Sequence, residues 1–170
     1  AANILLREFG GPAALTGFWR SIGDETSRLD RTEPALNNVP VTEFRDTTTP
    51  AAMARTVATL AFGDALPEAQ RATLRQWMID TLTGARRVRA GLPEGWVAGD
   101  KTGTSIWPGM DSLYVDIGFV ESPARGPFTF AAYYRARGTH EGMDPASEAV
   151  LAQVGEVLAA FAEEKDDWPF

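Results

Sequence analysis

The sequence contains no cysteine and only one histidine, His140. Without cysteine, the chain can form neither a disulfide framework nor a thiolate nucleophile. A single imidazole leaves little for a metal site built on histidine. The net charge of -7 opposes binding to nucleic acid or to an anionic membrane surface, and no apolar run is long enough to cross a membrane. We therefore expect no cofactor, no metal, no nucleic acid and no membrane partner.

The chain has enough apolar residues to build a core. It contains 170 residues, of which 44% are hydrophobic and 23% are charged, as is typical of an ordinary globular domain. It begins with Ala1 rather than Met, inside a helical pattern and without a preceding N-cap residue. We therefore expect it to be part of a longer protein.

The first half of the chain has helical periodicity. Glycine and proline signals predict helices over 2–9, 12–22, 49–62 and 67–84. In the last of these, we expect Leu74, Trp77, Met78 and Leu82 to face inward. Periodicity is lost over 24–48, and an irregular segment of that length in a compact domain is more often functional than accidental.

The second half changes to a period of two. Apolar residues alternate in strands predicted over 96–104, 113–119 and 128–134, and the short connections favour an antiparallel meander. A helix is expected from Asp144 onward, with its apolar face over the sheet. The residues expected on that face are Val150, Val154, Val157, Leu158 and Phe161. The polar tail from Glu163 to Phe170 is predicted to fray.

The 24–48 loop carries a possible general base. Glu33 and Asn37 are four positions apart, so one turn of backbone can aim both at the same water molecule. Pro34 follows the acid, which permits a cis peptide bond at this point. Arg31 and Asp46 are placed to pair across the neck of the loop. The alternative is an ordinary polar surface loop between two helices.

A second chemical signal is the run Lys101-Thr102-Gly103-Thr104 at the end of the first strand. Lysine is rare here, with two against fourteen arginines. Its ammonium group can hold a carboxylate, the threonine hydroxyls add donors, and Gly103 lets a ligand lie close to the strand. Taken alone, the run is weak evidence for a binding site, and a plain edge-strand ending is the favoured alternative.

Together these motifs resemble a class A serine β-lactamase. The matching stretches, in the family's order, are Arg-Thr-Glu-Pro-Ala-Leu-Asn at 31–37 with Asp46, Trp-Met at 77–78, Arg-Ala-Gly-Leu-Pro at 89–93 with Gly-Trp at 95–96, and Gly-Asp-Lys-Thr-Gly-Thr at 99–104. The family's Ser-x-x-Lys motif is absent, because none of the six serines is followed by Lys three residues later. The Ser-Asp-Asn motif is also absent, and Ala1-Ala2-Asn3 resembles the residues that come shortly after it. The nucleophile is therefore not on this chain.

The resemblance implies an α/β (α+β) fold of the β-lactamase/transpeptidase type. Its antiparallel sheet has flanking helices and is joined to an all-α domain, and both parts are incomplete in this chain. Residues 1–85 would form the C-terminal half of the all-α domain, including the omega loop at about 24–48. Residues 86–170 would give three strands and the last helix of the other domain. The implied partner is an N-terminal segment carrying Ser-x-x-Lys and Ser-Asp-Asn, in an enzyme that is monomeric when complete and periplasmic or secreted.

The resemblance also implies roles in the hydrolysis of β-lactams. Glu33 would be the base that activates the deacylating water, and Asn37 would hold that water. Asn3 would brace the omega loop, and the pair formed by Arg31 and Asp46 would support its neck.

Further implied roles concern substrate binding. Lys101 would stabilise charge near the absent serine and the substrate carboxylate. Thr102, Gly103, Thr104 and Ser105 would line the binding strand, with the Thr104 N–H forming half of an oxyanion hole. The strand after the triad lacks the arginine that many family members use, and Arg87 could take its place. The alternative for Arg87 is a solvated side chain.

Two other functions remain open at this point. The chain could belong to a non-catalytic β-lactam-binding or sensing module, or it could be an inactive subdomain. A sensor benefits from a long-lived acyl-enzyme and lacks a deacylating base, so the intact Glu33 and Asn37 favour hydrolysis. Trp107, in an insertion-like segment at 106–111, could cover the mouth of the site or pack on the surface.

Overall fold

The structure is a computed structural model, and it describes residues 1–163. Its elements are, in chain order, helices α1 (Ala2–Phe9) and α2 (Gly11–Ser21), the 3-10 turn η1 (Ala35–Asn37), helices α3 (Pro50–Ala61) and α4 (Glu68–Asp80), the 3-10 turn η2 (Val88–Gly91), strands β1 (Val97–Ser105), β2 (Leu113–Ser122) and β3 (Gly126–Arg135), and helix α5 (Pro145–Glu163). The predicted fraying of the tail falls mostly on 164–170, outside the described residues.

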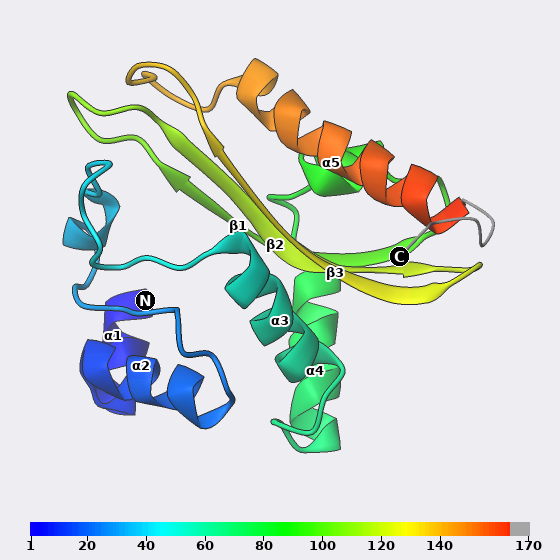
Figure 1. Cartoon of the computed structure of the whole chain (residues 1–170), viewed down its shortest axis with the longest axis horizontal. Helices are drawn as coiled ribbons and strands as arrows, with labels where there is room; N and C mark the ends of the chain where they lie inside the picture. The colour runs from blue at the N-terminus through cyan, green and yellow to red at the C-terminus, as the bar shows by residue number, and fades with distance from the viewer. Residues whose placement is uncertain (164–170) are drawn as a thin grey trace.

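The three strands form one antiparallel sheet in the order β1-β2-β3. The meander predicted from the period-two pattern is therefore confirmed, although β1 begins at Val97 rather than Trp96. Figure 1 shows α5 and η2 on one face of the sheet and α3 and α4 on the other. The result is a helix–sheet–helix arrangement in which β1 is an edge strand.

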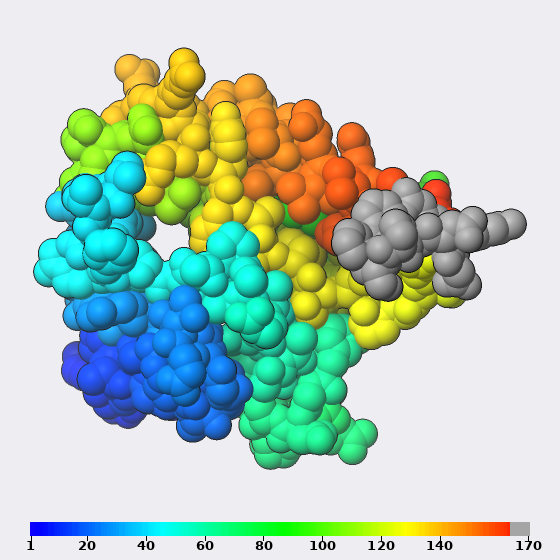
Figure 2. Space-filling view, in the orientation of Figure 1, coloured from blue at the N-terminus to red at the C-terminus, as the bar shows by residue number. Residues whose placement is uncertain are grey.

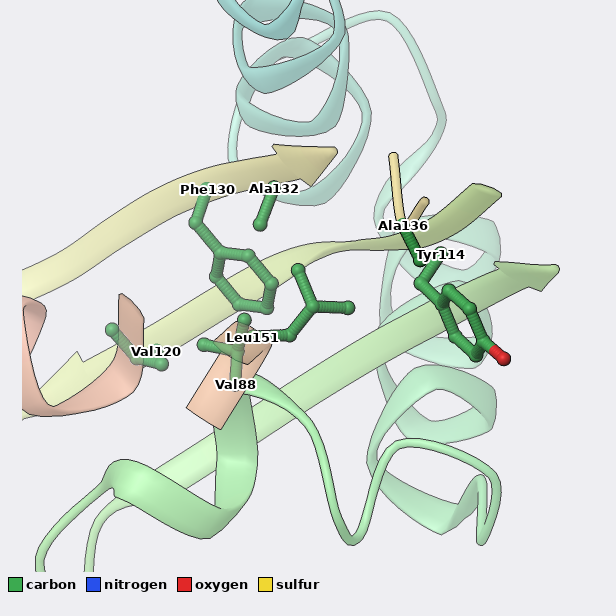
Figure 3. Packing of buried hydrophobic residues seen from close by; sticks show 7 residues of the cluster. All are labelled: Val88, Tyr114, Val120, Phe130, Ala132, Ala136 and Leu151. Carbon is green, nitrogen blue, oxygen red and sulfur yellow. The ribbon is translucent and has the colours of Figure 1, made fainter. Parts of the chain in front are cut away.

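The main core lies between the sheet and α5. Val88 of η2 and Leu151 of α5 meet apolar side chains that project from β2 and β3 (Figure 3). The strand and post-strand members of this cluster are Tyr114, Val120, Phe130, Ala132 and Ala136. Because Val88 adjoins Arg87, this core also fixes a residue that the sequence placed near the binding strand.

Helix α5 crosses η2 at very close range. A Cβ atom on Gly155 would lie 2.0 Å from the Val88 carbonyl oxygen, and one on Gly91 would lie 2.0 Å from the Ala152 carbonyl oxygen. Only glycine allows backbones to approach this closely.

The buried face of α5 differs from the predicted face. Its buried apolar and small residues are Leu151, Gly155, Ala159 and Ala162, while Val154 and Leu158 pack at the edge of the core. The inward positions assigned to Val157 and Phe161 were wrong, since these residues are 67% and 38% exposed. The close crossing selects small residues, whereas the sequence pattern was read from the large ones.

Helix α4 ends earlier than predicted, at Asp80, because Thr81 is extended. Leu82 therefore lies outside the helix and is exposed, and Trp77 is 70% exposed. Both were predicted to face inward, and both predictions were wrong. Leu74 and Met78, four positions apart, lie on the partly buried side of the helix, and Trp77 falls off that line.

Helices α1 and α2 pack against each other beside the 24–48 loop (Figure 1). Their contact includes the rings of Phe9 and Phe18, whose centroids are 6.3 Å apart. Ile4, Leu5 and Phe9 are nevertheless more than half exposed. The domain boundary near residue 85 stays a prediction. Helices α3 and α4, which precede it in the chain, contact the sheet that follows it.

Candidate active site

The neck of the 24–48 loop is held by the pair formed by Arg31 and Asp46. Arg31 Nε donates to Asp46 Oδ2 at 2.5 Å, and Asp46 Oδ1 accepts from the backbone N–H groups of Asp30 and Arg31 at 2.7 and 2.9 Å. The Asp46 side chain is only 3% exposed. One carboxylate thus joins two distant points of the loop backbone.

A second anchor at the start of the loop was missed by the sequence analysis. The Asp24 carboxylate accepts hydrogen bonds from the backbone N–H groups of Thr26 and Ser27 and from the hydroxyls of Ser27 and Thr56. Burial raises the pKa of Asp24, but these hydrogen bonds outweigh it and hold the pKa at about 2. The spacing of Asp24 and Thr26, typical of an Asx-turn, was the available signal.

Glu33 and Asn37 lie together in the loop. Asn37 Nδ2 donates to Glu33 Oε2 at 2.5 Å, and the peptide bond between Glu33 and Pro34 is cis. Asn3 of α1 braces the same residue, because its Nδ2 donates to the Glu33 carbonyl oxygen at 2.8 Å and its Oδ1 accepts from the Glu33 N–H at 3.0 Å. The exposed carboxylate keeps further acceptor sites for a water molecule.

The loop meets strand β1 at Ser105, whose hydroxyl donates to the Asn37 carbonyl oxygen at 2.9 Å. Side chains alternate along a strand, so Lys101, Gly103 and Ser105 share one face. Lys101 is exposed, and its Nζ donates to the Thr102 carbonyl oxygen. The structure therefore brings the face that carries Lys101 to the loop that carries Glu33.

The opposite face of β1 carries Thr102 and Thr104. Thr102 Oγ1 donates to Thr83 Oγ1 at 2.8 Å, and Thr104 Oγ1 accepts from Arg87 Nη2 at 2.6 Å. Arg87 is 1% exposed, so a solvated arginine at this position is ruled out. Its guanidinium lies against β1, where it donates to the Gly103 carbonyl oxygen and to Thr104 Oγ1.

Two groups near β1 were not identified from the sequence. Asp100 is buried and pairs with Arg89, and its Oδ2 lies so close to Gly84 that a Cβ there would be 1.3 Å away. Asp116 Oδ2 accepts from the Val88 N–H at 3.1 Å. Burial and the neighbouring Asp100 carboxylate raise the pKa of Asp116 to about 7. Asp116 thus keeps its proton below about pH 7, while Asp100 is paired with Arg89.

An apolar groove of about 670 Å³ adjoins Glu33. It lies between α1, α2 and the loop, and residues such as Leu5, Phe9, Leu29 and Leu36 line it. Glu33 therefore lies beside a large apolar surface. A separate opening, between the cyan part of the loop and the body that carries the sheet, is visible in Figure 2.

Residues 1–163 contain no group of three or more His, Cys, Asp or Glu side chains placed to hold a metal ion. Within this described part of the chain, no helix has the length and apolar composition needed to span a membrane. The candidate site therefore consists of an exposed carboxylate, an amide, a lysine and hydroxyl groups around an edge strand.

Comparison with known proteins identifies the family to which this chain is similar. Residues 1–162 match the model of the beta-lactamase enzyme family. The chain is 44% identical over 163 residues to a beta-lactamase of Mycobacterium tuberculosis, covering 94% of this chain and 52% of that protein. It is 56% identical over 115 residues to beta-lactamase FAR-1 of Nocardia farcinica, covering 68% of this chain and 37% of that protein.

Solved structures agree with this comparison. An ancestral class A beta-lactamase is 47% identical, with a TM-score of 0.85, and the match covers 94% of this chain and 59% of that one. The beta-lactamase from Streptomyces albus G is 39% identical, with a TM-score of 0.84, over 94% of this chain and 57% of that one. The chain spans about half the length of the curated relatives that it matches over most of its own length. On the family match, the identities and the shared fold of mixed helices and antiparallel sheet, the chain belongs to the beta-lactamase enzyme family, among its class A serine members.

Proposed function

We propose that this chain forms part of an enzyme that hydrolyses the β-lactam ring of penicillin- and cephalosporin-type antibiotics through a serine acyl-enzyme. The observation that carries the proposal is the hydrogen-bonded pair of Glu33 and Asn37 held against β1 by Ser105. The chain supplies the deacylation base and the Lys-Thr-Gly strand. It does not supply the nucleophile.

Deacylation uses the loop. The Glu33 carboxylate takes a proton from a water molecule that Asn37 also holds, and the resulting hydroxide attacks the acyl carbonyl carbon. The serine leaves with a proton returned from the base, and the ring-opened acid is released. Asn3, Arg31 and Asp46 position the base. This positioning matters because a misplacement of about 1 Å can cost roughly a hundredfold in rate.

Substrate binding uses β1. Lys101 stabilises negative charge at the substrate carboxylate and beside the serine of the Ser-Asp-Asn motif. Thr104 donates to the carboxylate, and Thr102 does so by turning its hydroxyl proton from Thr83 to the substrate. The Thr104 N–H forms half of the oxyanion hole. Gly103 and Ser105 shape the strand against the ring. Arg87 supports this carboxylate site through Thr104.

The partner in this proposal is an N-terminal segment of the same enzyme that carries Ser-x-x-Lys and Ser-Asp-Asn. The exposed side chains of Ile4, Leu5 and Phe9 and the apolar groove next to Glu33 form the surface that this segment covers. We call the assembly of the 170-residue chain with such a segment the completed protein. It is monomeric, acts in the periplasm or outside the cell, and requires no cofactor.

Turnover of a chromogenic cephalosporin by the completed protein tests the proposal. The parent is expected to hydrolyse it, and Glu33→Gln is expected to reduce steady-state turnover by about 10²–10⁴-fold because the general base is lost. Glu25→Gln, an exposed glutamate at the start of the same loop, serves as the matched control and is expected to change turnover by less than about twofold. A completed, folded parent that binds the drug covalently without turnover would instead indicate a sensing module.

A further inference from the structure

Residues 106–111 form a segment that none of the roles above uses. They connect β1 to β2 and therefore form the tip of a hairpin, which we call the hairpin tip. Within it, the Met110 N–H donates to the Trp107 carbonyl oxygen at 3.1 Å, and Gly109 has a φ of 78°. Pro108 followed by a glycine with positive φ is typical of a type II turn. The hairpin tip is therefore a tight, regular turn.

The segment that follows β3 holds the hairpin tip in place. The Thr139 hydroxyl donates to the Met110 carbonyl oxygen at 2.6 Å. The Gly138 N–H donates to Asp111 Oδ1 at 2.8 Å, and the Gly138 carbonyl oxygen accepts from the N–H of the buried Ser112 at 2.9 Å. These bonds attach backbone and side-chain groups of the turn to one neighbouring segment. The hairpin tip therefore has a defined position relative to the sheet.

The hairpin tip begins where β1 meets the 24–48 loop. Ser105 directly precedes the tip, and its hydroxyl donates to the Asn37 carbonyl oxygen. Asn37 in turn donates to the Glu33 carboxylate. Figure 1 shows the turn between β1 and β2 close to the cyan part of this loop. The hairpin tip therefore borders the candidate active site at the end of β1.

The chemistry of penicillins decides which part of the substrate lies near the hairpin tip. The acylamino group and the free carboxylate leave the fused rings on opposite sides. In the proposed function, the carboxylate binds at Lys101 and Thr104, and the carbonyl carbon lies within reach of the water on Glu33. The acylamino group is attached to the carbon next to that carbonyl. Its side chain therefore extends toward the junction of Ser105 and Asn37, and beyond it toward the hairpin tip.

Trp107 has the properties of a side chain that can contact an apolar group. It is half-buried, as is Ile106 beside it. Within residues 1–163, no aromatic ring or arginine stacks on the Trp107 indole. Tryptophan offers a large flat apolar surface, and aromatic pairs gain free energy beyond the area that they bury. An aromatic acyl side chain can supply the ring partner that this part of the protein does not.

We propose that Trp107 is a specificity-determining residue that contacts the acyl side chain of the substrate and favours aromatic acyl groups. Thr139 is a positioning residue for this contact, because it holds the hairpin tip that carries Trp107. The proposal rests on the proposed function. It names the preferred substrate class, which is penicillins and cephalosporins with an aromatic acyl side chain.

The test compares two penicillins that differ only in the acyl group. In the completed protein, Trp107→Ala is expected to lower kcat/KM for the phenylacetyl penicillin by about three- to tenfold, the size of one aromatic contact. The same variant is expected to change kcat/KM for the acetyl penicillin by less than about twofold. Met143→Ala is the matched control, since Met143 is an exposed apolar residue in the segment after β3. Both substrates are expected to behave with this control as with the parent.

Conservative variants separate a contact with the substrate from a structural role. Trp107→Phe keeps an aromatic ring, so kcat/KM for the phenylacetyl penicillin is expected to stay within about twofold of the parent. If Trp107→Ala does not fold, Trp107→Leu, which keeps an apolar side chain without the ring, is expected to show the same selective fall. An equal fall for both penicillins in these variants, or no fall for either, would overturn the inference.

A double-mutant cycle tests the role of Thr139. Thr139→Val removes the hydroxyl that holds the hairpin tip, and it is expected to reduce the preference for the phenylacetyl penicillin by about two- to threefold. If Thr139 acts through Trp107, then Thr139→Val has little further effect on this preference in the Trp107→Ala background. Additive effects would contradict the positioning role.

The outcomes also separate this inference from the function on which it rests. A parent that turns over both penicillins, combined with an unselective Trp107→Ala, overturns only the role of Trp107. A completed, folded parent without any turnover contradicts the proposed function, and the role of Trp107 fails with it.

Discussion

The 24–48 loop and the sheet region hold their functional groups in opposite ways. The loop keeps Glu33 exposed and fixes it with hydrogen bonds at its two ends, through Asp24 and Asp46. The sheet region buries Asp100, Asp116 and Arg87 and fixes them by close packing of backbones. The difference suggests that changes in the loop alter rate more than stability, whereas changes behind the sheet alter stability first.

The largest effect on stability is expected at the close crossing of α5 and η2. Gly155→Ala places a Cβ against the Val88 carbonyl oxygen and is expected to lower the free energy of unfolding of the completed protein by about 3–5 kcal/mol. Gly17→Ala, also within a helix but with open space around it, is the control. It is expected to raise the free energy of unfolding by about 0.5–1 kcal/mol. Chemical denaturation measures both, and equal effects would contradict the close crossing.

An intermediate effect is expected from the buried acids. The pKa of Asp116 is about 7 in the folded protein, against 3.8 for an ordinary aspartate. The folded state therefore holds an extra proton between these values, and the free energy of unfolding falls by about 1.4 kcal/mol per pH unit as the pH rises through this window. Asp116→Asn removes this titration. The free energy of unfolding of the variant is therefore expected to rise relative to that of the parent by about 2–3 kcal/mol between pH 5 and pH 7.

Unfolding at several pH values, with Asp64→Asn as an exposed control, measures this gain for Asp116→Asn. A difference between variant and parent that does not change with pH would show that Asp116 is ionised in the folded protein.

The smallest effect on stability is expected in the loop. Arg31→Ala removes a partner of Asp46, but the Asp46 carboxylate keeps its two backbone donors, so the free energy of unfolding is expected to fall by only about 1 kcal/mol. Turnover is expected to fall about ten- to a hundredfold, because Glu33 is no longer held in place. If stability and turnover change in the same proportion as in Gly155→Ala, the contrast between the two regions does not hold.

The parts of the fold that follow local rules were predictable from the sequence. The antiparallel meander follows from alternating residues and short turns, and the pair formed by Arg31 and Asp46 follows from opposite charges that bracket one loop. The face of α5 was misassigned at Val157, because a pattern of large apolar residues does not show where two backbones cross. The face of α4 was misassigned at Trp77, which falls off the line of Leu74 and Met78.

The buried acids that the sequence analysis did not identify share one property, which is that their partners lie far away in the sequence. Glu148 lies in the first turn of a helix, where an acidic residue is expected for local reasons, and its partner Arg87 is far away in the sequence. Asp116 has the alternation expected of a strand residue, and only burial beside Asp100 gives it an altered pKa. These properties arise from tertiary contacts, which sequence spacing alone does not reveal.

The role of Glu33 is tested most directly by observing the acyl-enzyme itself. The completed protein with Glu33→Gln is mixed with a penicillin, and the intact mass of each polypeptide is followed over time. We expect a long-lived adduct on the N-terminal segment, no adduct on the 170-residue chain, and rapid loss of the adduct in the parent. An adduct that decays equally fast in parent and variant would contradict the role of Glu33 as the deacylation base.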